Sequence, residues 1–264
     1  MSKLESTRYT VLFAAAVCVV CAFVVALSAV GLSAKQEAEA RQYRQKNVLI
    51  AAGLARPGEA LTAAEIDRLF AENIRVGLVD LRTGAKAELP GVDPKSYDQR
   101  KVRNDNALSH TAPPNNAGLS RLPNVGAVYY VAPKGGKVEL VVLPVEGGGM
   151  WGMVSGFIAL DTDGNTVRGL TFYEQKETPG LGGEIGNPKW QALWHGRRAY
   201  DAGWEPKLTV IKGRAGPPDK DPHRIDGLSG ATITSNAVTR LMAFWFSEKG
   251  YGPYLKRFRQ GDLA

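Results

Sequence analysis

The chain opens with one long apolar stretch. From Tyr9 to Ala34 no residue is charged, and about 26 residues at about 1.5 Å each form a helix of ~39 Å, enough to cross a bilayer. A cleaved signal peptide is the alternative, but its apolar core is only about 7–15 residues long and ends in a small-x-small site, where this chain has Leu32. The pattern predicts an uncleaved transmembrane helix over 9–34, after a short segment over 1–8.

The next pattern is helical and polar. Residues 35–60 predict a helical stalk that leaves the membrane and ends near Gly53, before Pro57 and Gly58. A second helix is expected to begin after Leu61. Thr62 and Glu65 have the spacing of a capping box there, and the apolar residues that follow recur with the period of a helix face.

From residue 74 the apolar period changes to that of strands. We expect strands over Ile74–Leu81, Val125–Ala132, Val138–Leu143, Met153–Leu160 and Thr166–Tyr173. Pro90–Ser120 is a polar insertion without clear periodicity, and a glycine loop is expected over Gly147–Gly149. Short turns between the later strands favour antiparallel neighbours.

Three further elements complete the expected fold. They are a helix over Pro188–Gly196, a strand over Leu208–Lys212 and an amphipathic helix over Asn236–Lys249. The expected class is therefore α+β: one N-terminal transmembrane helix, then a domain over 61–264 with a largely antiparallel sheet and flanking helices.

Composition narrows the classes of function. The net charge of +7 could suit nucleic acid, but no element concentrates Lys and Arg with interleaved aromatic residues, so an anionic membrane or an acidic partner is the better match. Both cysteines, Cys18 and Cys21, lie inside the apolar stretch, where two small apolar residues are expected rather than a metal or redox pair. The three histidines are far apart in sequence, and we expect no metal site.

The segment from Asp226 to Ser235 carries the candidate chemistry. Its small residues run straight into a helix, and a helix start presents unpaired N–H groups that suit a phosphate. No Walker sequence is present. The alternative is an ordinary capped helix start, with Thr234 or Ser235 as the N-cap residue.

The same segment, Asp226-Gly-Leu-Ser-Gly-Ala-Thr232, resembles the flavinylation motif Asp-x-x-Ser/Thr-Gly-Ala-Thr of the FMN-binding domain family. The resemblance extends to the Gly147–Gly152 loop, to Glu177–Gly183 and to Gly250–Tyr254. Together with the single anchor helix, these segments resemble the C subunits of the sodium-translocating NADH:quinone reductase.

This resemblance implies a covalent flavin. Thr232 would carry FMN through a phosphoester, attached by a separate flavin transferase, because no activating base is evident beside it. The residues that would surround the attachment point are Asp226, Ser229, Gly230, Ala231, Ile233 and Thr234. Asp226 could serve the transferase, or it could only cap its own loop.

Two other loops are candidates for contact with the flavin ring. The first supplies Glu177, Thr178, Gly180, Leu181 and Gly182, and the second supplies Trp151. Glycines allow a flat ring to approach the backbone, and Leu or Trp could cover it. Each loop could also be an ordinary turn, and Trp151 could be a core residue.

The resemblance also implies a place in the cell and in a larger assembly. The chain would be one of six subunits of a complex in the inner membrane, relaying electrons during sodium transport without substrate turnover of its own. Charges around the apolar stretch point toward the opposite orientation, but the family and the lack of cysteine after Cys21 favour a cytoplasmic N-terminus and a periplasmic FMN domain.

Alternative functions remain at this stage. The chain could be the equivalent subunit of the ion-translocating ferredoxin:NAD reductase, or a free-standing membrane flavoprotein. A flavin-free scaffold with a chance motif is the alternative from a different class.

Overall fold

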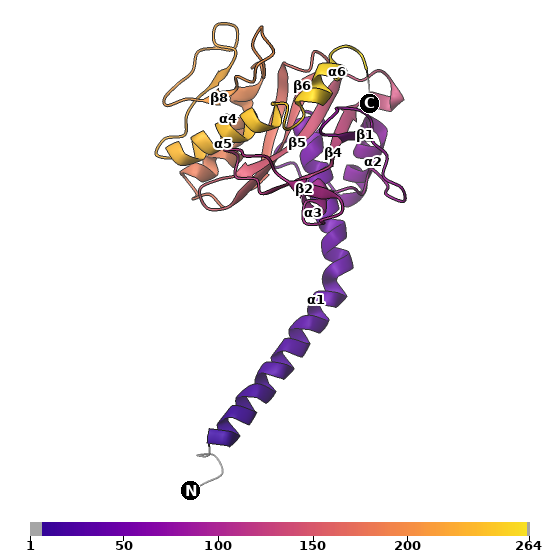
Figure 1. Cartoon of the computed structure of the whole chain (residues 1–264), viewed down its shortest axis with the longest axis vertical. Coiled ribbons are helices and arrows are strands. Elements are labelled where there is room, and N and C mark those ends of the chain that lie inside the picture. The colour runs from indigo at the N-terminus through magenta and orange to yellow at the C-terminus, as the bar shows by residue number, and fades with distance from the viewer. Residues whose placement is uncertain (1–6, 263–264) are drawn as a thin grey trace. The chain divides into compact units, whose positions relative to one another are not determined.

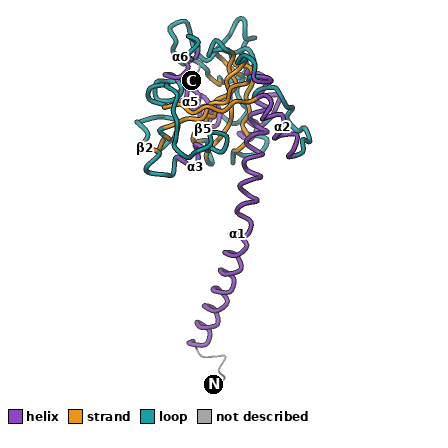
Figure 2. Tube along the Cα trace, turned by 90° about the vertical axis from the view of Figure 1, so that its right-hand side faces the viewer, coloured by secondary structure: helices purple, strands orange, loops and turns teal. Residues whose placement is uncertain are grey.

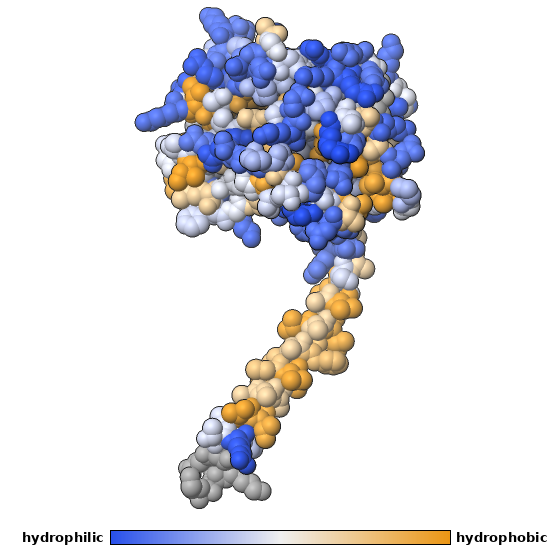
Figure 3. Space-filling view, in the orientation of Figure 1, coloured by the Kyte–Doolittle hydropathy of each residue, from blue (hydrophilic) through white to orange (hydrophobic). Residues whose placement is uncertain are grey.

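The apolar stretch lies within one long helix, α1 (Thr7–Ala51), in a computed structural model that describes residues 7–262. Side chains from Thr7 to Arg41 are exposed, and Figure 3 shows the apolar ones as a continuous surface. Among the described residues, α1 is the one helix long and apolar enough to cross a membrane. It fits a single-pass anchor, and of the expected segment 1–8 only Thr7 and Arg8 are described.

The last turns of α1 belong to the folded domain. The chain divides into two compact units, and the boundary in the sequence lies between Arg44 and Gln45. Val48 and Leu49 are fully buried, and Thr171 donates a hydrogen bond to Asn47 at 3.3 Å. In the stalk expected over 35–60, the helix ends at Ala51, close to the expected end near Gly53, and its last turn packs into the core instead of standing in solvent.

Helix α2 (Ala63–Asn73) begins as the sequence predicts. The Glu65 N–H donates to the Thr62 hydroxyl at 3.3 Å, and the Thr62 N–H donates to the Glu65 carboxylate at 2.8 Å. This reciprocal pair is the capping box. Ile66 and Phe70 are buried on one helix face.

The core of the domain is a five-stranded sheet in the order β1-β4-β5-β6-β7, with every neighbouring pair antiparallel. Its strands are β1 (Ile74–Asp80), β4 (Val125–Val131), β5 (Leu140–Gly148), β6 (Met153–Asp161) and β7 (Val167–Glu174). Figure 1 shows helix α5 (Thr232–Trp245) and helix α6 (Gly252–Phe258) in front of this sheet. The α+β class expected from the sequence is confirmed.

Alternation along the strands separates two cores. On β4, Val128 and Tyr130 face a cluster that includes α5 and α6, whereas Tyr129 and Val131 face a cluster formed with α2 and the end of α1. Figure 2 shows the strands between these two helical layers. Since both faces are covered, β4 is buried along its whole length.

The remaining elements are short and support loops. They are α3 (Gln99–Val102), β2 (Ser109–Thr111), β3 (Arg121–Pro123), η2 (Pro133–Gly135), η3 (Gly182–Gly186), α4 (Pro188–Gln191), η4 (Ala192–Trp194), β8 (Thr209–Val210) and β9 (Arg224–Ile225). Strands β2 and β3 pair antiparallel, while β8 and β9 pair parallel. The polar insertion over 90–120 therefore contains α3 and β2.

Three sequence predictions are corrected by these bounds. The glycine loop begins later than expected, because Gly147 and Gly148 still pair with β6. The strand expected over 208–212 shrinks to β8, since only Thr209 and Val210 have strand partners. The helix expected over 236–249 begins at Thr232, four residues earlier.

One carboxylate is buried in this framework. Glu146 on β5 is 2% exposed, and its side chain lies 2.9 Å from the Arg103 guanidinium. Burial raises the pKa of Glu146 above the ordinary value of 4.5, and Arg103 offsets part of that rise. The folded state therefore resists ionising this side chain more than the unfolded state does.

Gly169→Ala should destabilise the domain by about 1–3 kcal/mol, because an added Cβ would overpack its surroundings. That Cβ would lie 2.1 Å from the Ala51 carbonyl oxygen, which is backbone at the end of α1. Thermal unfolding of the full chain in detergent measures the effect. Gly186→Ala is the control, since its nearest neighbour lies at 3.9 Å, and equal midpoints for the two variants would contradict the prediction.

Glu146→Gln should change how stability depends on pH. The raised pKa means that wild-type stability is fully present below pH 4.5 and falls as the pH rises through the folded-state pKa, a fall that the variant lacks. Urea unfolding from pH 4.5 to neutrality should show the difference between variant and wild type growing in favour of the variant. Glu139→Gln, which removes an exposed carboxylate, is the control; a constant difference would oppose the assignment.

Candidate functional site

Helix α5 starts at the residue that the motif singles out. Ala231 is its N-cap and supplies no side-chain hydrogen bond, so the expectation that Thr234 or Ser235 caps the helix is wrong. The chain enters through Gly230, whose φ of +70° is left-handed and favours glycine. Thr232 is thus the first residue of the helix, and its side chain is exposed.

The two hydroxyls that were candidate caps have other partners. Thr234 is 2% exposed and donates to Glu177. Ser235 accepts from the Leu228 N–H at 3.3 Å, across the loop. Both are occupied inside the protein, whereas Thr232 faces outward.

The start of α5 leaves backbone N–H groups without a hydrogen-bond acceptor among the described residues. In the region covered by the structure, the N–H groups of Thr232, Ile233 and Thr234 donate to no protein acceptor, and the Ser235 N–H is the first to bond within the turn, to Ala231 at 3.0 Å. Unpaired N–H groups and the positive end of the helix dipole attract an anion. The residue that would carry a phosphate is therefore next to groups that would bind it.

Glu177 joins three segments at this point. Its carboxylate accepts from the Met150 N–H at 2.9 Å, from the Trp151 N–H at 3.0 Å and from the Thr234 hydroxyl. It is 4% exposed, and a buried carboxylate is stable only when it is paired or hydrogen-bonded. Glu177 fixes the positions of the 149–151 loop, its own loop and the start of α5 relative to one another.

The glycines around Glu177 make this convergence possible. A Cβ at Gly149 would lie 2.5 Å from the Glu177 carboxylate, and a Cβ at Gly182 would lie 2.4 Å from the Thr234 hydroxyl. Neither position has room for a side chain. Gly180 has a φ of +74° and open space around it, so its contribution is to the turn.

An apolar cavity of about 380 Å³ opens beside Thr232. It is lined by Met150, Trp151, Glu177, Thr178, Leu181, Gly182, Gly230, Ala231, Thr232, Ile233 and Thr234. Trp151 is 63% exposed and Leu181 44%, so Trp151 is not a core residue. Large apolar side chains held open to solvent mark a binding surface, and most of the residues predicted from the sequence line this one.

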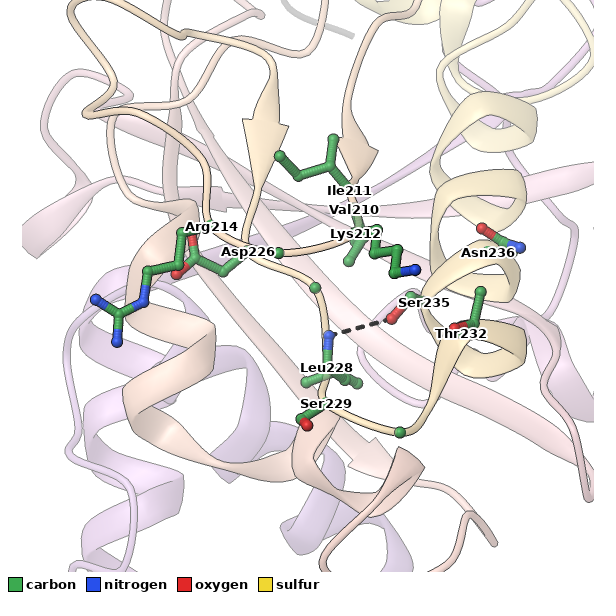
Figure 4. Close-up of a pocket in the computed structure, with 13 residues that line it drawn as sticks. Val210, Ile211, Lys212, Arg214, Asp226, Leu228, Ser229, Thr232, Ser235 and Asn236 are labelled. Carbon is green, nitrogen blue, oxygen red and sulfur yellow. Dashed lines mark hydrogen bonds between the residues drawn. The ribbon is translucent and has the colours of Figure 1, made fainter.

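A second cavity of about 460 Å³, more polar than the first and hereafter the polar cavity, borders the same loop (Figure 4). It is lined by Val210, Ile211, Lys212, Gly213, Arg214, Asp226, Gly227, Leu228, Ser229, Gly230, Thr232, Ser235 and Asn236. Gly230 and Thr232 line both cavities. The candidate attachment residue therefore sits between an apolar and a polar space.

Asp226 has a structural role that the structure makes plain. Its carboxylate accepts from the Ala215 N–H at 2.9 Å, and its carbonyl accepts from the Trp190 indole at 2.9 Å. The side chain therefore ties the motif loop to the segment at Ala215. The two roles that the sequence left open, service to the transferase and capping of its own loop, stay predictions.

Sequence reasoning missed several lining residues. Met150 stands next to the predicted Trp151 and could have been found from that loop. Asn236 lies one helix turn after Thr232 and could have been found from the helix period. Lys212 and Arg214 could not, because the pairing of β8 with β9 brings them to the motif. Among the described residues no group of three or more His, Cys, Asp or Glu side chains is placed to hold a metal ion.

Thr234→Val should destabilise the chain by about 1.5–3 kcal/mol, because it removes a donor from a buried carboxylate. Thr234→Ser keeps the hydroxyl that reaches Glu177 and should lose less. Urea unfolding of both variants measures the difference. Equal losses would contradict the prediction, because Thr234→Ser keeps the hydrogen bond that Thr234→Val removes.

Comparison with known proteins agrees with this geometry. Residues 149–247 match the FMN-binding domain family. The chain is 44% identical, over 98% of its length and 96% of the relative's, to the C subunit of the Na⁺-translocating NADH-quinone reductase of Yersinia pestis. It is 41% identical over 99% of both chains to the same subunit from Vibrio parahaemolyticus.

Solved structures show the same relationship. The fold is similar to that of NqrC from Shewanella oneidensis, with a TM-score of 0.75 and 30% identity over 83% of this chain and 98% of that one. The corresponding protein from Parabacteroides distasonis gives a TM-score of 0.64 at 25% identity, over 85% of this chain and 96% of that one. The resemblance drawn from the sequence motifs is confirmed, and this chain belongs to the family of C subunits of the Na⁺-translocating NADH-quinone reductase.

Proposed function

We propose that this chain is the subunit of the Na⁺-translocating NADH:quinone reductase that carries FMN as a phosphoester on Thr232. The observation that supports this most is the state of the hydroxyl groups in the motif. Thr234 and Ser235 are buried and hydrogen-bonded inside the protein, whereas Thr232 is exposed. Ser229 is exposed as well, but it precedes the helix start and its free N–H groups.

The residues around Thr232 suit a flavin. The apolar cavity, about 380 Å³, is within the usual size of small-molecule sites. Trp151 and Leu181 offer apolar surface for a ring, and the free N–H groups of Ile233 and Thr234 would hold the phosphate. When bound, the flavin supplies one- and two-electron chemistry, and the protein supplies attachment and orientation.

The same geometry supports attachment by a separate flavin transferase. The two carboxylates that line the cavities, Glu177 and Asp226, already accept hydrogen bonds from other groups. Neither is free to remove a proton from the Thr232 hydroxyl, as a general base must. The chain on its own is therefore expected to remain without flavin.

The proposed role is electron relay between the other members of a complex of six subunits, without independent substrate turnover and without nucleic acid as a partner. Helix α1 would anchor the chain in the inner membrane, with the N-terminus cytoplasmic and the FMN domain periplasmic. The absence of cysteine after Cys21 suits an oxidising compartment. Sodium would cross through partner subunits, because α1 carries no charge within its apolar stretch.

Thr232→Val should abolish covalent flavin while leaving the fold intact, because valine keeps the shape of threonine and lacks the oxygen that forms the ester. The full chain, co-expressed with a flavin transferase, is digested, and the peptide containing residue 232 is weighed by mass spectrometry. Ser229→Ala is the control and should keep the flavin. Retention of covalent FMN by the Thr232→Val chain would refute the assignment.

A further inference from the structure

We propose that Lys212 is the counter-ion of the phosphoester on Thr232 and positions the flavin phosphate in the polar cavity. The inference rests on the proposed function, and it concerns a residue outside the motif. It follows from the charge of the polar cavity, the direction of one side chain and the way that side chain is supported.

The polar cavity has an excess of positive charge. Lys212 and Arg214 line it, against the single carboxylate of Asp226, which already accepts from the Ala215 N–H. A phosphodiester between threonine and FMN keeps one negative charge at neutral pH. Charge-assisted hydrogen bonds between Lys or Arg and phosphate are shorter and stronger than neutral ones, so the cavity suits this group.

Direction distinguishes the two cations. Figure 4 shows the ammonium group of Lys212 directed toward the start of α5, where Thr232, Ser235 and Asn236 line the same cavity. The guanidinium of Arg214 points away, on the far side of Asp226. Of the two cations, only Lys212 points toward the helix whose first residue would be esterified.

The Lys212 ammonium group is also free to pair with an anion. Its side chain is exposed, and within residues 7–262 no carboxylate forms an ion pair with it, whereas Lys207 pairs with Asp201 at 3.5 Å and Arg224 with Asp221 at 2.9 Å. An anion on Thr232 would meet a cation that no carboxylate of the described residues neutralises.

The backbone that carries Lys212 is held against α5. The Val210 N–H donates to the Thr239 hydroxyl on α5 at 2.9 Å, and the Ile211 N–H donates to the Ile225 carbonyl at 2.9 Å. On the other side, the Gly227 N–H donates to Gly213 at 2.8 Å. The fold therefore fixes the backbone of Lys212 relative to the start of α5.

Because Thr232 lines both cavities, the flavin ring and the phosphate would occupy different ones. The apolar cavity with Trp151 and Leu181 suits the ring, and the polar cavity with Lys212 suits the phosphate. Lys212 would act as a positioning residue, because it holds the phosphate and does not meet the redox-active ring.

The first test compares the reactivity of lysines with and without flavin. Full-length wild-type chain, matured by the transferase, and the flavin-free Thr232→Val chain are treated briefly with an acetylating reagent, and each lysine is quantified by mass spectrometry. An ion pair of about 1 kcal/mol should slow acetylation of Lys212 roughly threefold to fivefold in the flavin-carrying chain. Lys220, exposed on the same segment but outside the cavity, should react equally in both.

The second test separates charge pairing from simple shielding. The phosphorus-31 resonance of the phosphoester should move in Lys212→Met, return toward the wild-type position in Lys212→Arg, and stay unchanged in Arg214→Met, which removes a cation that lines the same cavity but points away. A merely structural lysine would leave the resonance in place. The resonance is measured on the intact chain in detergent.

The outcomes are distinguishable from failure of the proposed function. If Thr232 carries FMN but Lys212 reacts at the same rate with and without it, or Arg214→Met moves the resonance as much as Lys212→Met, the role of Lys212 is refuted and the flavin assignment stands. If wild-type Thr232 carries no flavin, both proposals fall. Selective protection of Lys212 together with a resonance that depends on its charge supports the counter-ion.

Discussion

The site depends on one buried carboxylate. Glu177 accepts hydrogen bonds from two N–H groups of the 150–151 segment and from the Thr234 hydroxyl on α5. Because burying an unpaired carboxylate is costly, the three segments are stable only together. Loss of any one donor would leave this buried carboxylate with fewer hydrogen bonds. The loops that border the apolar cavity are therefore held by electrostatics as much as by packing.

Under the proposed attachment, this arrangement accounts for the choice of one hydroxyl among several in the motif. Thr232 and Thr234 are two residues apart, so they point to different sides of a helix turn. The second turns inward to the carboxylate, and the first is left at the surface between two cavities. The fold thus makes Thr232 accessible by giving its neighbours partners elsewhere, and the free N–H groups of the helix start remain beside it.

Features formed by residues close in sequence could be predicted, and features formed by residues far apart in sequence could not. The capping box of Thr62 and Glu65 and the hairpin turns involve residues close in sequence, so α2 and the antiparallel strands could be expected. The start of α5 was misplaced because Ala231 supplies no side-chain cap and Thr234 bonds to a residue 57 positions away. Lys212 and Arg214 reach the site through the pairing of β8 with β9, which no local spacing encodes. Knowledge of the family located Thr232, which residue patterns alone had left open.

The buried end of α1 determines where the folded domain begins. Asn47, Val48 and Leu49 belong to its core, and the carbonyl of Ala51 touches the backbone at Gly169. The border between lipid-facing and core-facing residues thus falls inside a continuous helix and not at a linker. A water-soluble fragment cut at the end of the apolar stretch would keep these turns, whereas one cut at the first glycine after the helix would remove a side of its own hydrophobic core.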